Sequence, residues 1–109
     1  MMRKKFTLCT MALENGNVWS TEHVFDQVGE RKNVVYLADE PFGQPDTVRK
    51  DRIGNIRICS GSAYPEVEMY IPGEFVTKRA QAKLRAALNG IVRRQAKEAL
   101  GKIRDFDFT

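Results

Sequence analysis

Few residues in this sequence have the types and spacing that catalysis or metal binding requires. His23 is the only histidine, and Cys9 and Cys59 are the only cysteines. Zinc sites draw on closely spaced groups of Cys and His, which this chain lacks. It also lacks the Gly-rich loops, GxGxxG or GxxxxGK[ST], that hold phosphates. The sequence therefore predicts no catalytic residue, no metal and no cofactor, and we expect a protein that is not an enzyme.

Acidic residues gather between positions 39 and 51, in a stretch that also holds Pro41, Gly43 and Pro45. Carboxylates grouped in one loop are ligands that a divalent cation accepts. The Pro and Gly residues are typical of an exposed loop, however, in which acids are simply solvated. We therefore expect a solvated loop rather than a cation site. The acids concerned are Asp39, Glu40, Asp46 and Asp51.

The cations are distributed unevenly along the chain. Residues 77–109 hold nine Lys and Arg against three Asp and Glu, whereas residues 1–76 hold nine against eleven. The formal net charge of +4 therefore originates in the C-terminal third. Such an asymmetry favours a nucleic acid or an acidic protein surface as the partner.

Most of these cations share one side of a predicted helix. At about 100° per residue, six of them lie within roughly 100° of one another if the helix is straight. A solvated helix face ordinarily mixes both signs of charge, so a face of one sign favours binding to a polyanion. We expect contacts to phosphates, which position a protein but do not read bases. The predicted residues, called the basic ridge below, are Arg79, Lys83, Arg93, Arg94, Lys97 and Arg104.

The helical pattern between residues 75 and 105 contains two apolar stripes that do not align. The first runs from Ala80 to Ile91 and the second from Val92 to Ile103, rotated by roughly 110° at the helical period. The change falls at Asn89-Gly90, a sequence that often ends helices. We expect a break or kink there, giving one bent helix or a helix pair. The alternative is one straight helix that packs on two different surfaces.

The second stripe predicts self-association. If the first stripe covers a sheet, the second points elsewhere, and a monomer seldom leaves so long an apolar stripe in water. A homodimer is therefore expected, while a sharp turn at Asn89-Gly90 would instead fold the stripe back onto its own domain. The predicted contact residues are Val92, Ala96, Leu100 and Ile103.

The first two thirds of the chain have strand patterns. Asn15-Gly16 between β-forming segments predicts a two-residue hairpin, with Leu13 opposite Val18 and Phe6 opposite Phe25. A helix from Ser20 or Thr21 to Gly29 is the competing interpretation of residues 20–28. Further strands are expected at 33–38, 53–59 and 67–71, and residues 39–50 are expected to form a loop.

Together these patterns predict a single α+β domain over residues 1–109. An antiparallel sheet of about five strands occupies residues 1–74, and a basic amphipathic helix or helix pair occupies residues 75–105. Unpaired cysteines favour a reducing compartment, so we expect a cytoplasmic protein. The sequence contains no apolar run long enough to span a membrane. The MMRKKFTLCTMAL start resembles a short signal peptide but lacks a small-residue cleavage site.

The function that best fits this layout is non-enzymatic binding of nucleic acid, DNA or RNA, through the basic helix. The alternative is a protein-binding inhibitor or an assembly subunit, in which the acidic sheet region or the basic helix docks on another protein. The small size and the lack of catalytic groups are typical of a protein encoded by a phage or mobile element.

Overall fold

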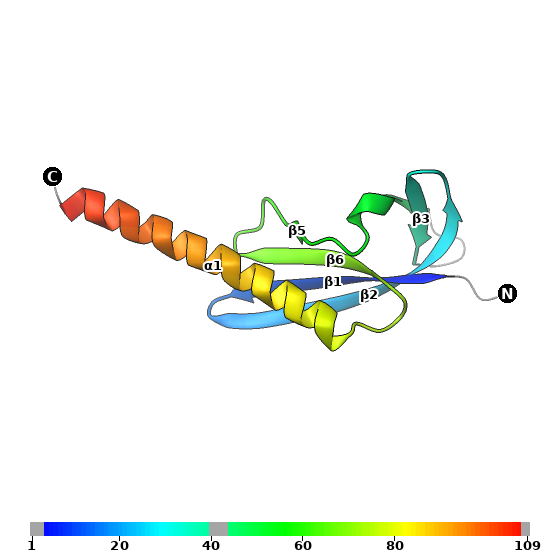
Figure 1. The fold of residues 1–109 in the computed structure, drawn as a ribbon, viewed down its shortest axis with the longest axis horizontal. Coiled ribbons are helices and arrows are strands. Elements are labelled where there is room, and N and C mark those ends of the chain that lie inside the picture. The colour runs from blue at the N-terminus through cyan, green and yellow to red at the C-terminus, as the bar shows by residue number, and fades with distance from the viewer. Residues whose placement is uncertain (1–3, 40–43, 108–109) are drawn as a thin grey trace.

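The computed structural model describes residues 4–39 and 44–107, and for residues 102–107 only the course of the backbone. A curled antiparallel sheet of six strands is covered on one side by one C-terminal helix (Figure 1). The strand order is β4-β3-β2-β1-β6-β5. The elements are β1 (Lys5–Glu14), β2 (Asn17–Glu30), β3 (Val34–Ala38), β4 (Asp46–Arg49), the 3-10 turn η1 (Lys50–Arg52), β5 (Arg57–Ile58), β6 (Glu66–Pro72) and α1 (Lys78–Asp107).

The hairpin between β1 and β2 forms at Asn15-Gly16, as predicted. Both residues have positive φ, 51° and 82°, which is the requirement of a turn whose twist matches that of the flanking strands. The predicted register is confirmed, with Leu13 opposite Val18 and Phe6 opposite Phe25. Residues 20–28 therefore belong to a strand, and the competing helix is wrong.

The length of β2 explains why the sheet curls. Its first part pairs with β1, and its last residues, Asp26 to Glu30, pair with β3. The register shifts between Gln27 and Gly29, and such a bulge bends a strand and increases its twist. The curl encloses a small apolar cluster away from the helix, made by Phe6, Val35, Leu37, Val48 and Tyr70.

Two predictions about the strands were wrong. Residues 39–50 were expected to form a loop, but Asp46–Arg49 is an edge strand paired with β3. Only Val48 of this strand is buried, so its sequence carries almost no apolar signal. Conversely, the strand expected at 53–59 is only Arg57–Ile58. Gly54 has a φ of 78°, which does not fit an extended strand. Ile53 forms only an isolated β-bridge with Tyr70.

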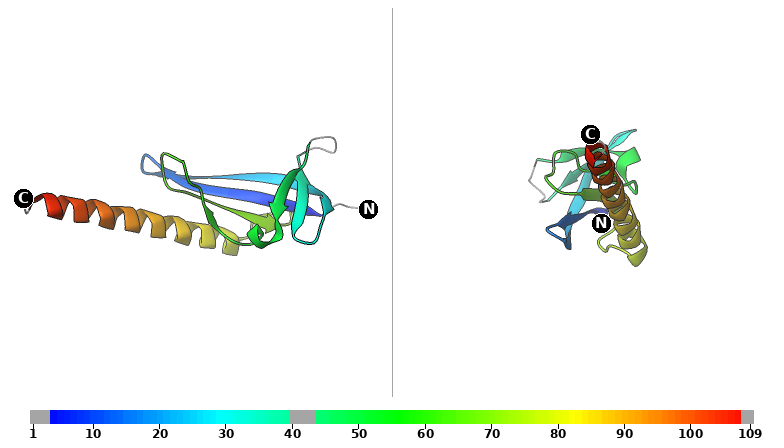
Figure 2. Two further views of the ribbon diagram at one scale, coloured as in Figure 1. Left: turned by 90° about the horizontal axis from the view of Figure 1, so that it is seen from above. Right: turned by 90° about the vertical axis from the view of Figure 1, so that its left-hand side faces the viewer.

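The main core lies between α1 and the strands β1 and β6. Its buried members are Cys9, Met11, Val67, Met69, Ile71, Ala80, Leu84, Leu88 and Ile91. The helix contributes residues of the first predicted stripe, and the sheet contributes alternate residues of two neighbouring strands. The view from above in Figure 2 shows helix and sheet as two layers.

The helix begins at Lys78 rather than at Phe75, because Thr77 caps it. The hydroxyl of Thr77 accepts a hydrogen bond from the backbone N–H of Ala80 at 3.1 Å, and its carbonyl accepts one from Gln81 at 3.1 Å. Phe75 lies in the preceding connection, and 81% of its surface is exposed.

The expected break at Asn89-Gly90 is absent, since α1 runs uninterrupted from Lys78 to Asp107. Gly90 does not have a positive φ, so it does not adopt the left-handed conformation that ends helices. A glycine inside a helix costs only about 1 kcal/mol relative to Ala. The surrounding Ala, Leu, Lys, Arg and Gln residues favour the helix strongly enough for it to continue past Gly90. The structure thus matches the alternative of one helix with two differently directed stripes.

The helix is longer than the sheet that it covers. Ile91 is its last buried residue, Val92 is half-buried, and every described side chain from Arg93 to Gly101 is exposed. Residues 93–107, called the arm below, project past the hairpin turn (Figures 1 and 2). The molecule is consequently elongated, 67 × 26 × 21 Å, with a Cα radius of gyration of 17.6 Å. A compact chain of this length has a radius of about 13 Å.

Candidate nucleic-acid interface

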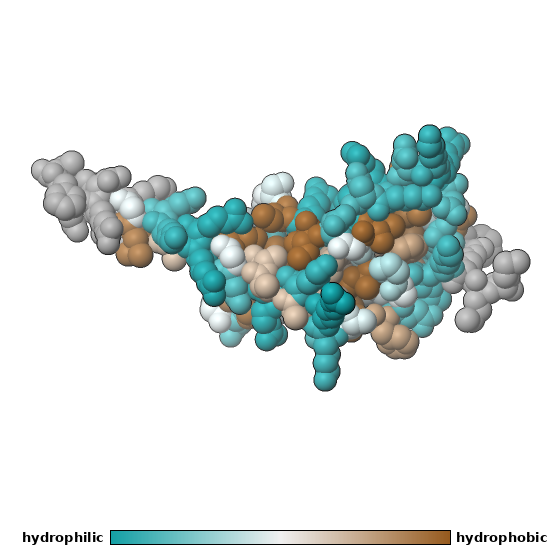
Figure 3. Space-filling model, viewed as in Figure 1, coloured by the Kyte–Doolittle hydropathy of each residue, from teal (hydrophilic) through white to brown (hydrophobic). Residues whose placement is uncertain are grey.

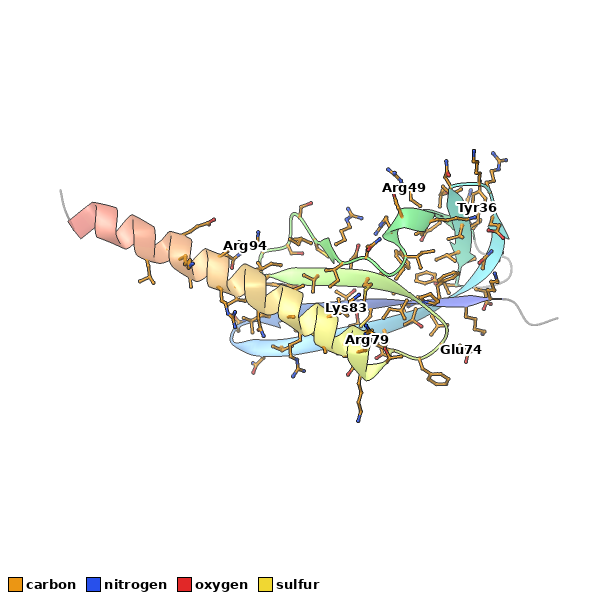
Figure 4. The ribbon with its side chains drawn as sticks, viewed as in Figure 1. Tyr36, Arg49, Glu74, Arg79, Lys83 and Arg94 are labelled. Atoms are coloured by element: carbon orange, nitrogen blue, oxygen red, sulfur yellow. The ribbon has the colours of Figure 1, made fainter. Side chains whose placement is uncertain are left out.

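Three members of the basic ridge lie on the side of α1 that faces β5. Arg79 and Lys83 border a cleft of about 170 Å³ between the start of the helix and β6. Arg94 borders a second cleft with Ile58 of β5. Figure 4 shows the three residues following one another along the helix. Arg79 and Arg94 are fifteen positions apart in the sequence, or about 22 Å along the axis at 1.5 Å rise per residue.

The remaining predicted residues extend this row along the arm. Arg93 and Lys97 are exposed there. Arg104 lies on the same helix, but its side chain is outside the described residues. All six positions lie on one uninterrupted helix, with Lys83 and Arg93 ten positions apart.

The cations of the helix differ from those of the sheet in their partners. The sheet region contains ion pairs between Lys5 and Asp26 at 3.3 Å, Lys50 and Glu30 at 2.8 Å, and Arg49 and Asp51 at 2.8 Å. The hydrogen bonds and charges within the first two pairs raise the pKa of Lys5 and lower the pKa of Glu30. Within residues 4–39 and 44–101, no Lys or Arg of α1 forms an ion pair. The positive charge of the helix is therefore uncompensated by direct contacts in this part of the chain.

The sheet contributes a charged cluster that sequence analysis missed. Arg52 Nη2 lies 3.1 Å from Glu68 Oε1, and Arg57 Nη1 lies 3.7 Å from the same oxygen. The Arg52 guanidinium also lies over the ring of Tyr70, 5.2 Å from its centre, while burial raises the pKa of the Tyr70 hydroxyl. These residues come from η1, β5 and β6, and their sequence positions gave no signal of this contact. The single carboxylate of Glu68 faces both guanidinium groups, and these contacts attach the connection 50–58 to β6.

The predicted acidic loop contains no grouped carboxylates in its described part. Asp39 lies 2.6 Å from His23 Nε2, and Asp51 pairs with Arg49. Glu40 is outside the described residues. Among residues 4–39 and 44–101, no three His, Cys, Asp or Glu side chains are placed to hold a metal ion.

Aromatic side chains of the sheet are engaged in contacts within the protein. Trp19 donates its ring N–H to Glu14 at 3.2 Å and meets Tyr64 edge to face, with ring centres 5.9 Å apart. Tyr70 is buried. Single-stranded nucleic acids stack on exposed rings beside cations. The sheet does not present such a combination at these rings.

The residues predicted for self-association differ in how far they are buried. Val92 is half-buried at the root of the arm, where it borders a cleft of about 470 Å³ with Leu13, Gly16 and Tyr64. Ala96 and Leu100 are exposed, Leu100 with 60% of its surface accessible. The side chain of Ile103 is outside the described residues.

Comparison of this chain with protein-family models, with curated proteins and with solved structures gave no match. No helix in the described part of the chain is both long enough and apolar enough to cross a membrane.

Proposed function

We propose that this protein is a non-enzymatic nucleic-acid-binding protein whose basic ridge contacts the phosphate backbone. One observation carries the proposal: the described cations of α1 form no ion pairs with the protein, whereas most of those in the sheet do. Cations without an internal partner can neutralise phosphates without giving up an ion pair. Neutralising phosphates releases the counterions condensed on the nucleic acid, and this release drives binding.

The shape of the helix supports the same function. A rigid row of cations about 22 Å long spans roughly six base-pair steps of B-DNA at 3.4 Å per step. Figure 3 shows hydrophilic side chains along the described part of α1, separated by paler and apolar patches, and a band of apolar surface beside the helix. Contacts of this kind fix the position of the backbone without reading bases, so we propose binding with little sequence preference.

Fluorescence anisotropy with labelled duplex DNA, single-stranded DNA and RNA tests this function. If three to five cations each neutralise one phosphate, duplex affinity falls by about 40- to 500-fold between 50 and 200 mM salt. The same titration identifies the preferred form of nucleic acid. An absence of binding to all three at low salt would refute the proposal.

The helix offers a closely matched pair of variants. Arg79→Gln with Lys83→Gln removes two cations from the ridge, while Lys78→Gln with Arg85→Gln removes the same two residue types from the opposite flank. At about 100° per residue, these two pairs point roughly 120° or more apart. We expect the ridge variant to weaken binding and to flatten its salt dependence, and the flank variant to retain most of the affinity. Equal losses would show that only net charge matters.

A further inference from the structure

The apolar stripe along the arm and its root, called the seam below, has the spacing found where two helices pack together. Val92, Ala96 and Ala99 are separated by four and then three residues, and Ile103 continues the alternation in the sequence. Spacings of four and three repeat along the contact line of two packed helices. The two alanines are small, so a second helix could approach closely. A nucleic acid does not require this pattern, so the seam calls for a separate explanation.

The arm also lacks the contacts that normally stabilise a helix. From Arg93 to Gly101 all described side chains are exposed, including Leu100. Most helices in proteins are stabilised by packing of an apolar face. The large radius of gyration shows the same feature, since the arm extends away from the domain. A partner that covers the seam would supply the missing contacts.

The sheet leaves a matching apolar surface uncovered beside the helix. Leu13 packs against the main core under α1, and Val18 is directly opposite Leu13 in the hairpin. Directly opposed residues of an antiparallel pair lie on the same face of the sheet. Val18 therefore lies on the helix-covered face, yet 51% of its surface is exposed, because α1 packs on β1 and β6 and does not reach across β2.

From these observations we infer that two copies of this chain form a two-fold dimer in which the arms pack antiparallel along Val92, Ala96, Ala99 and Leu100. In this arrangement the end of each arm lies beside the hairpin of the other copy, next to its exposed Val18. The same patch serves on both copies, as a two-fold interface requires.

The arms alone offer too little area for a stable interface, so a dimer must also use surface beyond them. The arm is about 22 Å long and about 10 Å wide, so its projected contact surface is roughly 220 Å². Stable interfaces bury about 800 Å² on each partner. Two parallel arms touching only each other would fall short of this area. In the antiparallel arrangement each arm also touches the helix and hairpin of its partner, which enlarges the buried area.

The ridge members on the β5 side of the helix remain accessible in this dimer, whereas Arg93, seven residues before Leu100, lies beside the interface. The accessible members, Arg79, Lys83 and Arg94, border clefts with β6 and β5. Val92 instead borders the cleft beside the hairpin turn. Arg85 lies about 120° from the centre of the ridge and, seven residues before Val92, in line with the seam, so it is a cation that the partner's arm must pass. Association therefore does not depend on the proposed nucleic-acid binding.

Light scattering and sedimentation of the full chain without nucleic acid test the inference. We expect a particle of twice the 12.4 kDa chain mass. Leu100→Glu should yield a monomer with unchanged near-ultraviolet signal from Trp19, because Leu100 supports no core of its own. Ala86→Glu adds the same charge at an exposed position of α1 outside the seam and should leave the dimer intact. A monomeric wild type at millimolar concentration, or a Leu100→Glu variant that remains dimeric, would overturn the inference.

The antiparallel arrangement has its own test on the hairpin. Val18→Lys places a cation where the partner's arm would lie and should weaken association at least tenfold by sedimentation equilibrium. Val28→Lys makes the same exchange at an exposed position near the other end of β2 and should not weaken it. If both variants dimerise like the wild type while Leu100→Glu is monomeric, the arms meet without the hairpin and the antiparallel placement is wrong.

Discussion

The hydroxyl of Thr7 donates a hydrogen bond to the backbone carbonyl of Gly73, 2.8 Å away and sixty-six residues later in the chain. Gly73 lies just after β6, has a φ of 101°, and donates its own N–H to the carbonyl of Lys5 at 2.7 Å. Strand β1 therefore holds the turn from which the chain enters the helix. This contact helps to set the direction in which α1, and with it the basic ridge, crosses the sheet.

Replacing Thr7 with Val should lower the free energy of unfolding by about 1 kcal/mol, the net contribution of a typical hydrogen bond. Thr7 is fully buried and Val has nearly the same shape, so packing is preserved. Urea denaturation measures the change. Thr21→Val, at an exposed position of β2, is the control and should alter stability by less than about 0.5 kcal/mol. An unchanged midpoint for Thr7→Val would show that the hydrogen bond contributes nothing.

Gly90→Ala should raise the free energy of unfolding by about 0.5–1 kcal/mol, because alanine favours helix interiors. A Cβ added at Gly90 would meet no atom within 4 Å outside the helix's own nearby backbone. Gly73→Ala should instead destabilise the protein, since its positive φ disfavours a side chain. Thermal melts compare the two. Destabilisation by Gly90→Ala would indicate a turn at Asn89-Gly90 rather than a continuous helix.

Leu84→Ala and Leu100→Ala should change the free energy of unfolding by different amounts, because the two residues belong to different stripes of α1. Leu84 is completely buried against the sheet, so its truncation should cost about 2–5 kcal/mol. Leu100→Ala should leave the stability of dilute, monomeric protein nearly unchanged and should lower the melting temperature only at concentrations where the chain associates. Melting curves over a range of protein concentrations provide the measurement. A large, concentration-independent loss for Leu100→Ala would place that side chain in the core.

The Cys59 thiol should react slowly with alkylating reagents. Burial first, and then the charges of Glu68 and Glu66, raise its pKa from 9.0 to about 11. The thiolate is the reactive form, so alkylation at neutral pH should be on the order of a hundredfold slower than for an unperturbed thiol. Mass spectrometry after timed iodoacetamide treatment measures the rate, and the urea-unfolded chain provides the unperturbed reference.

The same shift predicts how stability depends on pH. Because the folded pKa is raised, Cys59 in the unfolded chain loses its proton near pH 9 while the folded chain keeps it until about pH 11. The contribution to stability is therefore complete below pH 9 and decreases as the pH rises towards 11. Cys59→Ala should reduce this loss. If the wild type and Cys59→Ala lose the same amount of stability between pH 9 and 11, the raised pKa of Cys59 is contradicted.

The sequence by itself determined the local features. Asn15-Gly16 fixed the hairpin and its register, because positive φ at two successive residues is available to few other pairs. Helical period and composition located α1 to within a few residues and identified both stripes. Charge counts placed the surplus of cations on this helix. These properties depend on neighbouring residues only, which is why a linear pattern reveals them.

The tertiary structure decided whatever depends on residues distant in sequence. It made Asp46–Arg49 a strand, because β3 offers an edge there although the segment has little apolar content. It carried the helix through Gly90 and past the sheet, so that the first stripe lies against the sheet, whereas Ala96 and Leu100 of the second stripe are exposed. It also paired most of the cations in the sheet region with acids such as Glu68 and left the described cations of the helix without such partners. Pairing requires side chains to meet across strands, and the sequence alone does not specify which strands become neighbours.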